Sequence, residues 1–381
     1  MPQFISEYIW IISDSPYSSP FLSGSKEFGT INPCFLIDQY SGKRPAIINK
    51  KFLKCRQIEF PICPSALLDS NLVDQVYAIA NGGKAKDGFK YLLEFLTEKC
   101  WDFSLCFYYV EHFCKAKNHE EFVENAIKRT HALLTIHSMN ELEFLHSGKI
   151  LPNPEAVENY LNLSGAHDLN EVASQRVEEF SSNFSKRYIL DLIEAIEIAL
   201  IKMFLLRRVE MTKATPLKQH EAFVAFLKRD LGITLARESH LALHYFYDQA
   251  GRLFGIQPNT PINKALATIN STAWDMYLLR MPELLFSSQP PDLFLSFIAT
   301  EEKQLGHLAK LFSVESISGT SKGNLLPDIG YLLNELPKEA EDALQQDVFQ
   351  HRCVLHTERK SVPVGLHDAM VNELRRVLPG T

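Results

Sequence analysis

The sequence lacks any pair of cysteines in a CxxC spacing. Its seven cysteines form an odd set, so neither a disulfide framework nor a zinc ribbon is expected, and most thiols should be reduced and buried. It also lacks a Walker A loop, a dinucleotide-binding fingerprint and an HExxH motif, which removes the usual sequence signatures of ATPases, dehydrogenases and zinc proteases. No internal repeat is present, so a solenoid is not expected.

No apolar run is both long enough and free enough of charge to cross a membrane. The longest apolar region, from Tyr188 to Leu206, is interrupted by Asp191, Glu194 and Glu197, which a bilayer core tolerates poorly. These three acids recur every three residues, as the solvated face of a helix would. The amino terminus lacks the positive segment and long apolar stretch of a secretory signal. We therefore expect a cytoplasmic protein with no membrane partner.

Positive charge is not in excess. The formal net charge of −7 argues against a broadly basic surface, so any nucleic-acid role must be local. With 381 residues, 46% of them hydrophobic, the chain can bury one large core or two modest ones. Basic residues that could contact a nucleic-acid backbone gather in the second half of the chain: Arg207, Arg208, Lys213, Lys218, Lys228, Arg229 and Arg237. They would line a groove if this part of the chain folds over an acidic site, and an ordinary charged surface is the alternative.

Two apolar segments far apart in the chain each deliver an acid at their end. The first, Ser65 to Leu68, is followed by Asp69, and the second, Leu293 to Ala299, is followed by Thr300 and two glutamates. Short apolar runs followed by helix-compatible sequence are typical of buried strands in an α/β sheet, which binds ligands at the carboxyl ends of its strands. The sequence therefore predicts that distant carboxylates converge at one edge of a sheet.

Helix capping is the alternative interpretation of the same residues. Asp69, Ser70, Asn71 and Thr300 are all favourable N-cap types, and acids fit the first turn of a helix because of the helix dipole. If capping explains them all, the chain would be a mainly helical protein without this site.

Three segments together resemble the PIN-like nuclease superfamily. Its pattern is an apolar strand ending in Asp-Ser/Thr-Asn, an internal Glu, a helix-borne Asp, and a strand ending in Thr-x-Asp. The matching segments, in the expected order, are Leu67-Leu-Asp69-Ser-Asn71, Ala273-Trp-Asp275-Met and Ile298-Ala-Thr300-Glu-Glu302-Lys-Gln-Leu305. Glu302 departs from the pattern, since it stands where the family has Asp; it keeps the charge but lengthens the arm by one methylene.

The internal glutamate of the pattern has three candidates. Glu111 follows an aromatic run, as though a core helix presented it, and Glu141 and Glu238 are its rivals. The resemblance implies that Asp69 is the central metal ligand, that Asp275 and Glu302 complete the cluster, and that Glu111 binds or orients through water. Three polar residues would hydrogen-bond to these ligands: Ser70, Asn71 and Thr300.

The activity that the resemblance implies is metal-dependent phosphodiester hydrolysis. Mg²⁺ or Mn²⁺ prefers oxygen ligands, and such a site acts most often on RNA or another single-stranded nucleic acid. Nucleases of this kind are often toxins or antiviral-defence effectors, and a protein regulator or a homo-oligomer is compatible with such a role. A catalytically degraded PIN-like scaffold is the second interpretation, favoured by Glu302 and by the acidic net charge.

The expected fold is a three-layer α/β domain with a central, mostly parallel sheet and a large α-helical insertion. Residues 1–60 predict an irregular or small β lead-in, and residues 61–315 the PIN-like domain, with its helical insertion at about 166–255. From about Ser313 the sequence predicts a Gly/Ser loop, a helix from Lys338 to Phe349 and a mixed tail, and residues 316–381 are the expected C-terminal extension. His240 and His244, four apart, could share a helix face, but no third zinc ligand is evident.

Overall fold

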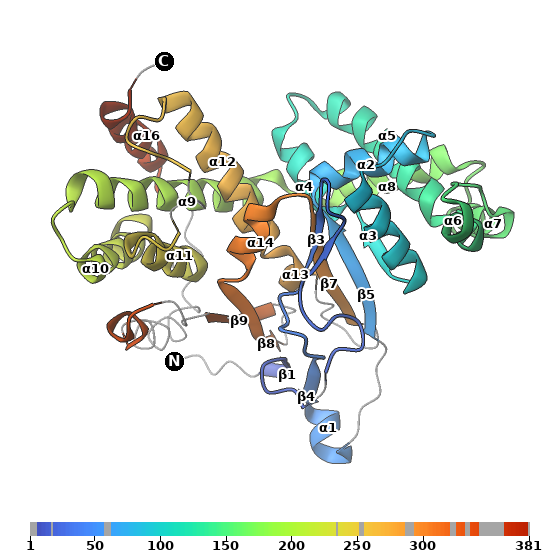
Figure 1. The fold of residues 1–381 in the computed structure, drawn as a ribbon, viewed down its shortest axis with the longest axis horizontal. Coiled ribbons are helices and arrows are strands. Elements are labelled where there is room, and N and C mark those ends of the chain that lie inside the picture. The colour runs from blue at the N-terminus through green and yellow to red at the C-terminus, as the bar shows by residue number, and fades with distance from the viewer. Residues whose placement is uncertain are drawn as a thin grey trace. The chain divides into compact units, whose positions relative to one another are not determined.

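The computed structural model describes most of the chain: residues 6–16, 18–56, 62–233, 235–250, 255–285, 293–320, 325–331, 336–342 and 362–379. The chain divides into two compact units, each described here by itself. The sheet unit consists of Met1–Lys186, Leu278–Gly306 and Val314–Ile329. The helical unit consists of Arg187–Tyr277, His307–Ser313 and Gly330–Thr381. Figure 1 shows the path of the chain.

A five-stranded sheet forms the centre of the sheet unit, in the order β2-β3-β7-β5-β6. Its strands are β2 (Lys26–Phe28), β3 (Cys34–Ile37), β7 (Leu293–Thr300), β5 (Ile62–Leu68) and β6 (Asp102–Ser104). Strand β5 runs parallel to both of its neighbours, whereas β2 and β3 add an antiparallel edge. The expected α/β class is therefore confirmed, and the two acid-bearing strands lie next to each other.

A second, four-stranded sheet has the order β4-β1-β8-β9. It consists of β4 (Ala46–Asn49), β1 (Ser6–Ile11), β8 (Phe312–Thr320) and β9 (Leu325–Tyr331), and β1 is antiparallel to both β4 and β8. Residues predicted as a separate lead-in thus supply strands to both sheets, followed by α1 (Lys50–Cys55). The predicted loop from Ser313 is wrong, because β8 obtains backbone partners from β1 that no local pattern reveals.

Helices of the sheet unit follow the strands along the chain. They are α2 (Ser70–Ala80), α3 (Asp87–Glu98), α4 (Cys106–Lys115), α5 (His119–His137), α6 (Glu141–Ser147), α7 (Pro154–Ser164) and α8 (Leu169–Asn183). Helix α2 buries Leu72, Val73 and Val76, which the 3.6-residue period places on one face. It packs against α5, and α5 packs against α8. The short helix α13 (Met281–Leu284) lies against β7.

Aromatic side chains fill the core beneath the five-stranded sheet. Phe297 of β7 is 1% exposed, and its ring centroid lies 4.8 Å from that of Trp101 and 5.6 Å from that of Tyr40. Aromatic pairs at such spacings stabilise a core beyond the area that they bury. This packing fixes β7, and with it the residues that follow β7.

The helical unit contains the predicted apolar helix as α9 (Lys186–Leu205), which is buried nearly all round from Ile193 onward. It continues into a π-helical turn, η1 (Leu206–Glu210), and a second such turn, η2 (Leu227–Leu231), follows α10 (Pro216–Phe226). The other helices are α11 (Ala236–Phe246), α12 (Ile262–Leu278) and α16 (Leu366–Val377), and α14 (Lys303–Ala309) joins the two units in sequence.

The C-terminal region differs in part from the sequence prediction. Of the helix predicted from Lys338 to Phe349, residues 338–342 are helical and the rest lies outside the described residues. Helix α16 stands where a mixed tail was expected. Within the described part of the chain, no helix has the length and apolar character needed to cross a membrane.

Candidate functional site

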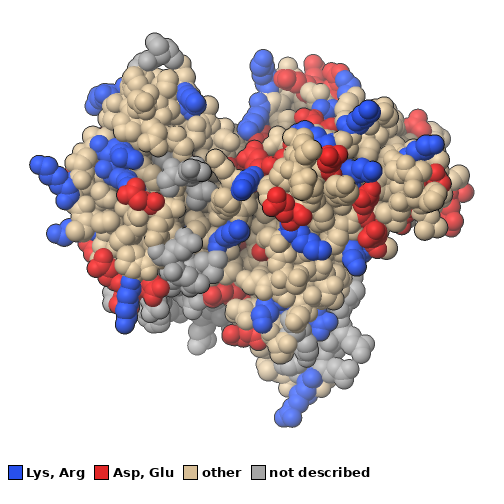
Figure 2. Space-filling model, in the orientation of Figure 1, with Lys and Arg blue, Asp and Glu red and all other residues tan. Residues whose placement is uncertain are grey.

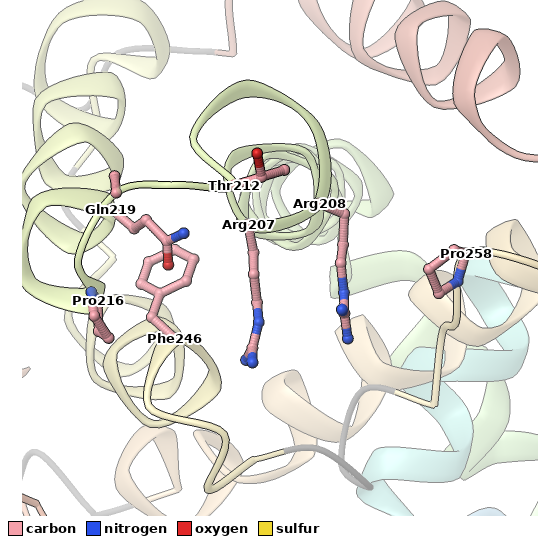
Figure 3. Close-up of a pocket in the computed structure, with 8 residues that line it drawn as sticks. Arg207, Arg208, Thr212, Pro216, Gln219, Phe246 and Pro258 are labelled. Atoms are coloured by element: carbon pink, nitrogen blue, oxygen red, sulfur yellow. The ribbon is translucent and has the colours of Figure 1, made fainter.

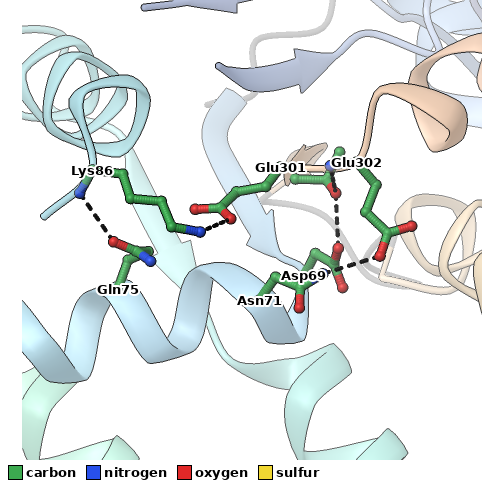
Figure 4. A network of polar contacts seen from close by, with 7 residues as sticks. Asp69, Asn71, Gln75, Lys86, Glu301 and Glu302 are labelled. Atoms are coloured by element: carbon green, nitrogen blue, oxygen red, sulfur yellow. Dashed lines mark hydrogen bonds and ion pairs between the residues drawn. The ribbon is translucent and has the colours of Figure 1, made fainter. Parts of the chain in front are cut away.

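The candidate site lies where β5 and β7 end side by side. Their parallel register pairs Leu68 with Ala299, and the backbone N–H of Asp69 donates to the carbonyl of Ala299 at 2.9 Å. Asp69 directly follows β5. Thr300 is the last residue of β7, and Glu302 lies two residues after it. Figure 4 shows the Asp69 and Glu302 side chains near the start of α2. The sheet therefore joins acids that are more than two hundred residues apart in sequence.

Asp69 does not act as a helix cap through its side chain. It occupies the N-cap position of α2 but makes no side-chain capping hydrogen bond. Instead, its Oδ2 accepts a hydrogen bond of 2.7 Å from the Thr300 hydroxyl, and the residue is only 8% exposed. Capping explains Ser/Thr/Asp residues only when the side chain accepts from the first turn. For the Asp69 carboxylate, the capping interpretation is therefore wrong.

Thr300 connects the two strand-end acids. Its hydroxyl donates to Asp69 and accepts the backbone N–H of Glu302 at 2.9 Å. A threonine hydroxyl has one donor and two acceptor positions, so both bonds can form at once. Because Thr300 is completely buried, this geometry is fixed by the core.

The two residues after Asp69 each hold a different glutamate. The Ser70 hydroxyl donates to Oε2 of Glu111, which reaches the site from α4, and Asn71 Nδ2 donates to Oε1 of Glu302 at 3.1 Å. Glu111 also forms an ion pair of 2.6 Å with Lys115, one turn further along α4. Asp69, Ser70 and Asn71, three consecutive residues at the start of α2, thus contact partners from two distant parts of the chain, α4 and the end of β7. Glu111, one of the three candidate glutamates, contacts Ser70 next to Asp69, and its charge acts on the Asp69 carboxyl.

The electrostatics of the site centre on Asp69. Burial raises its pKa from the ordinary 3.8 to about 6, against the hydrogen bond from Thr300, and the charges of Glu302 and Glu111 raise it further. A carboxyl that is desolvated beside like charges holds its proton more tightly than a solvated one. Perturbed carboxyls of this kind concentrate at functional sites, although ion-pair networks perturb pKa values too.

Basic side chains stand beside the acids, and sequence reasoning missed them. Lys86 pairs with Glu301 at 2.5 Å, and its backbone N–H donates to Gln75 Oε1 at 3.1 Å (Figure 4). Arg129 bonds to Asp74 at 2.7 Å. Lys115, which pairs with Glu111, is the one basic residue of the site that the sequence could have indicated. It lies four residues after Glu111, a spacing that favours an ion pair on a helix. On the face drawn in Figure 2, the basic and acidic side chains of the described residues are intermixed.

The basic residues predicted for a nucleic-acid groove all lie in the helical unit. Lys213, Lys228 and Arg229 are exposed there, whereas Arg207 and Arg208 line a cavity. For Arg237 the prediction of a nucleic-acid contact is wrong. The residue is 4% exposed, and its guanidinium carbon lies 5.8 Å from the ring centroid of Phe312. A side chain buried in this way cannot contact a nucleic-acid strand at the surface.

The remaining predicted acids are placed as follows. Asp275 is half-buried on α12 of the helical unit, and its participation in the cluster stays a prediction. Glu141 begins α6 as an exposed residue, and Glu238 is fully buried on α11 of the helical unit. Glu283, which no sequence motif singled out, is a buried carboxylate (4% exposed) on α13, against β7.

The donor set at the site suits a hard divalent cation. Carboxylate oxygens are the ligands that Mg²⁺ and Mn²⁺ prefer, and Asp69, Glu302 and Glu111 supply them. Over the described residues, however, no three His, Cys, Asp or Glu side chains are already grouped as metal ligands. The Nε2 atoms of His240 and His244 lie 3.0 Å apart, but among the described residues this pair is not part of a group of three possible metal ligands.

Comparison with known proteins adds no relative, since no family model, no curated protein and no solved structure matches the chain. The geometry of the site is therefore the basis for inferring what the protein does.

Proposed function

We propose that the site at the ends of β5 and β7 makes this protein a metal-dependent endoribonuclease. The observation that carries the proposal is Asp69: a buried carboxyl, with a pKa raised to about 6, beside the charges of Glu302 and Glu111. A structural core position seldom gathers three acids, because their mutual repulsion destabilises the fold unless a cation offsets it. Asp69 and the two glutamates would hold Mg²⁺ or Mn²⁺.

The residues of the chain would divide the work. A bound divalent cation supplies Lewis-acid activation of water and of the scissile phosphate. Thr300 fixes the orientation of the Asp69 carboxylate, and Ser70 and Asn71 hold the two glutamates. Such hydrogen-bonding partners determine where ligand oxygens point.

Cations at the edge of the site support a phosphodiester substrate. Lys86, Lys115 and Arg129 all belong to the sheet unit, and each is paired with an acid there. Lysine and arginine side chains in such positions can contact phosphates without reading the base sequence. The substrate that we propose is RNA or another single-stranded nucleic acid, and a toxin or antiviral-defence effector is the corresponding biological role.

Cleavage of labelled RNA tests the proposal. Purified full-length protein is incubated with 5′-labelled RNA and Mn²⁺, and wild type is compared with Asp69→Asn. Asp74→Asn is the matched control, because it makes the same change at an exposed position of α2. We expect cleavage by wild type and by the control and none by Asp69→Asn. Cleavage that survives in Asp69→Asn removes this residue from the mechanism.

A fourth acid of the cluster can be sought in the same assay. Asp275→Asn tests the helix-borne acid that the resemblance implies, and Glu283→Gln tests the buried acid beside β7. The variant that loses cleavage while keeping the wild-type melting temperature identifies the contributing residue. If neither variant loses activity, the site operates with Asp69, Glu111 and Glu302 alone.

A non-catalytic scaffold is the second candidate function. It is favoured by the hydrogen bonds that already occupy the acids, since Glu111 contacts Ser70 and Lys115, and Glu302 contacts Asn71. In that case Mn²⁺ should neither raise the melting temperature nor support cleavage of any RNA by the wild-type protein. Both results together would replace the nuclease proposal with this one.

A further inference from the structure

The helical unit contains a cavity of about 440 Å³ that is lined by two arginines. Arg207 and Arg208 come from the π-helical turn η1, and Figure 3 shows their side chains extending alongside each other toward the same space. The rest of the lining is polar, small or aromatic and contains no carboxylate: Thr212, Ala214, Pro216, Gln219, Phe246 and Pro258. Short π-helical turns within α-helices occur frequently at functional sites.

Arg207 is held in place by the end of α11. Its guanidinium donates to the carbonyl of Tyr245, pairs with Asp248, and lies 4.9 Å from the centroid of the Tyr245 ring. A cation at the C-terminus of a helix is favoured by the helix dipole. These contacts use part of the five N–H groups of the arginine, so others remain for a ligand. Arg207 is therefore preorganised, with its side chain 12% exposed.

Arg208 is the more accessible of the two cations. It is an exposed residue, and it lines the cavity beside Arg207. Burial raises the pKa of Tyr245, and the positive charge of Arg208 opposes that rise, so the two side chains are close. Two adjacent guanidinium groups without a carboxylate in the lining match the forked geometry of a phosphate group.

The N-terminus of α10 adds to the same preference for an anion. Pro216, the first residue of this eleven-residue helix, lines the cavity, and the Thr215 hydroxyl accepts from the N–H of Lys218. Gln219 is 5% exposed, and its Nε2 donates to the carbonyl of Met211 at 2.9 Å, which fixes this wall. The positive end of a helix dipole near two arginines favours negative charge.

We infer that this cavity binds a phosphate-bearing ligand of the nucleotide class, with Arg208 as its main anchor and Arg207 as a fixed second contact. The phosphate comes either from a free nucleotide or from the 5′ end of an RNA strand. The site belongs to the helical unit, and it does not depend on nuclease activity at Asp69.

Binding of AMP tests the inference in the full-length protein with EDTA present, so that no RNA is cleaved. Titration calorimetry compares AMP with adenosine for wild type, Arg208→Gln and Arg229→Gln. Arg229 is the matched control, because it is an exposed arginine in the other π-helical turn, η2. We expect AMP but not adenosine to bind. Arg208→Gln should weaken AMP binding by about tenfold or more, and Arg229→Gln should leave it unchanged.

Competition separates the two sources of phosphate. Displacement of AMP by a 5′-phosphorylated oligoribonucleotide, but not by its 5′-hydroxyl form, identifies an RNA end, and failure of both to compete identifies a free nucleotide. Three results overturn the inference: equal binding of adenosine and AMP, equal losses in Arg208→Gln and Arg229→Gln, or no AMP binding at millimolar concentration. Circular dichroism melting of each variant verifies that it is folded.

Discussion

The Thr300 hydroxyl donates to the Asp69 carboxylate at 2.7 Å, and this contact joins the ends of two parallel strands that come from opposite halves of the chain. The same oxygen accepts the N–H of Glu302, so one buried hydroxyl positions both acids. We therefore expect the Thr300 hydroxyl, with its two hydrogen bonds, to contribute to the stability of the fold as well as to function.

Thr300→Val should destabilise the protein by about 1–3 kcal/mol, because it leaves a buried acceptor and a backbone donor without their shared partner. Valine has nearly the same shape as threonine, so little packing is lost. Thr300→Ser is the control, since it keeps the hydroxyl and removes one methyl, at a cost of roughly 0.8 kcal/mol. Urea unfolding measures both, and a Thr300→Val variant as stable as wild type would show that the hydroxyl contributes nothing to stability.

Asp69→Asn should stabilise the protein in the absence of divalent metal at neutral pH. The pKa of Asp69 is raised from 3.8 to about 6 in the folded state, so the folded protein holds the proton more tightly. The penalty for ionising Asp69 therefore grows as the pH rises from about 4 to about 6 and then stays constant. At about 1.4 kcal/mol for each pKa unit, it amounts to about 3 kcal/mol at most.

Unfolding free energies measured with EDTA across that pH range test this expectation. The difference between wild type and Asp69→Asn should grow from pH 4 to pH 6 and level off above it. A difference that does not change with pH would mean that the Asp69 carboxyl is not perturbed.

Mn²⁺ should offset the advantage in stability that Asp69→Asn has over the wild type without metal. A ligand that binds only the folded state stabilises it by about 2.7 kcal/mol at one hundred times its dissociation constant. The wild-type melting temperature should rise with Mn²⁺, because the cation offsets repulsion among Asp69, Glu302 and Glu111. Asp69→Asn should lose the rise, and Glu302→Gln should reduce it. An equal rise in Asp69→Asn would place the bound Mn²⁺ elsewhere.

Sequence reasoning succeeded where the signal was local. The apolar runs of β5 and β7 and the long periodic pattern of α9 predicted these elements, because each carries its own hydrophobic signature. Adjacency of Asp69 and Glu302 followed from a general rule about parallel sheets, without knowledge of the strand order.

The sequence did not predict the elements and contacts that depend on tertiary structure. Strand β8 has the sequence Phe-Ser-Val-Glu-Ser-Ile-Ser-Gly-Thr, whose small and polar residues resemble a loop until β1 pairs with it. Lys86 could not be placed beside Glu301 from sequence, since they are 215 residues apart. Glu197, expected on the solvated face of α9, instead contacts α12 and α16.

Glu197 is the centre of a polar contact that holds three helices of the helical unit together. Its Oε1 accepts from Asn270 of α12 at 2.7 Å, and its Oε2 lies 3.1 Å from Nε2 of His367 on α16. The hydrogen bond to Glu197 raises the pKa of His367 above the ordinary 6.5, against burial, which lowers it; Glu194 and Asp368 add to the rise. A histidine with a raised pKa stabilises the folded state most when it is protonated.

The contribution of His367 should therefore be fully present below about pH 6.5 and should disappear as the pH rises through the higher folded-state pKa. We expect less than about 1 kcal/mol, because the pair is partly open to water. His367→Gln should remove this pH-dependent part, and His307→Gln, at an exposed histidine of α14, should not. Hydrogen exchange of α16 amides and thermal melting between pH 5.5 and pH 8.5 measure it. If His367→Gln and wild type lose stability in parallel over that range, Glu197 does not retain the proton on His367, and packing alone holds α16.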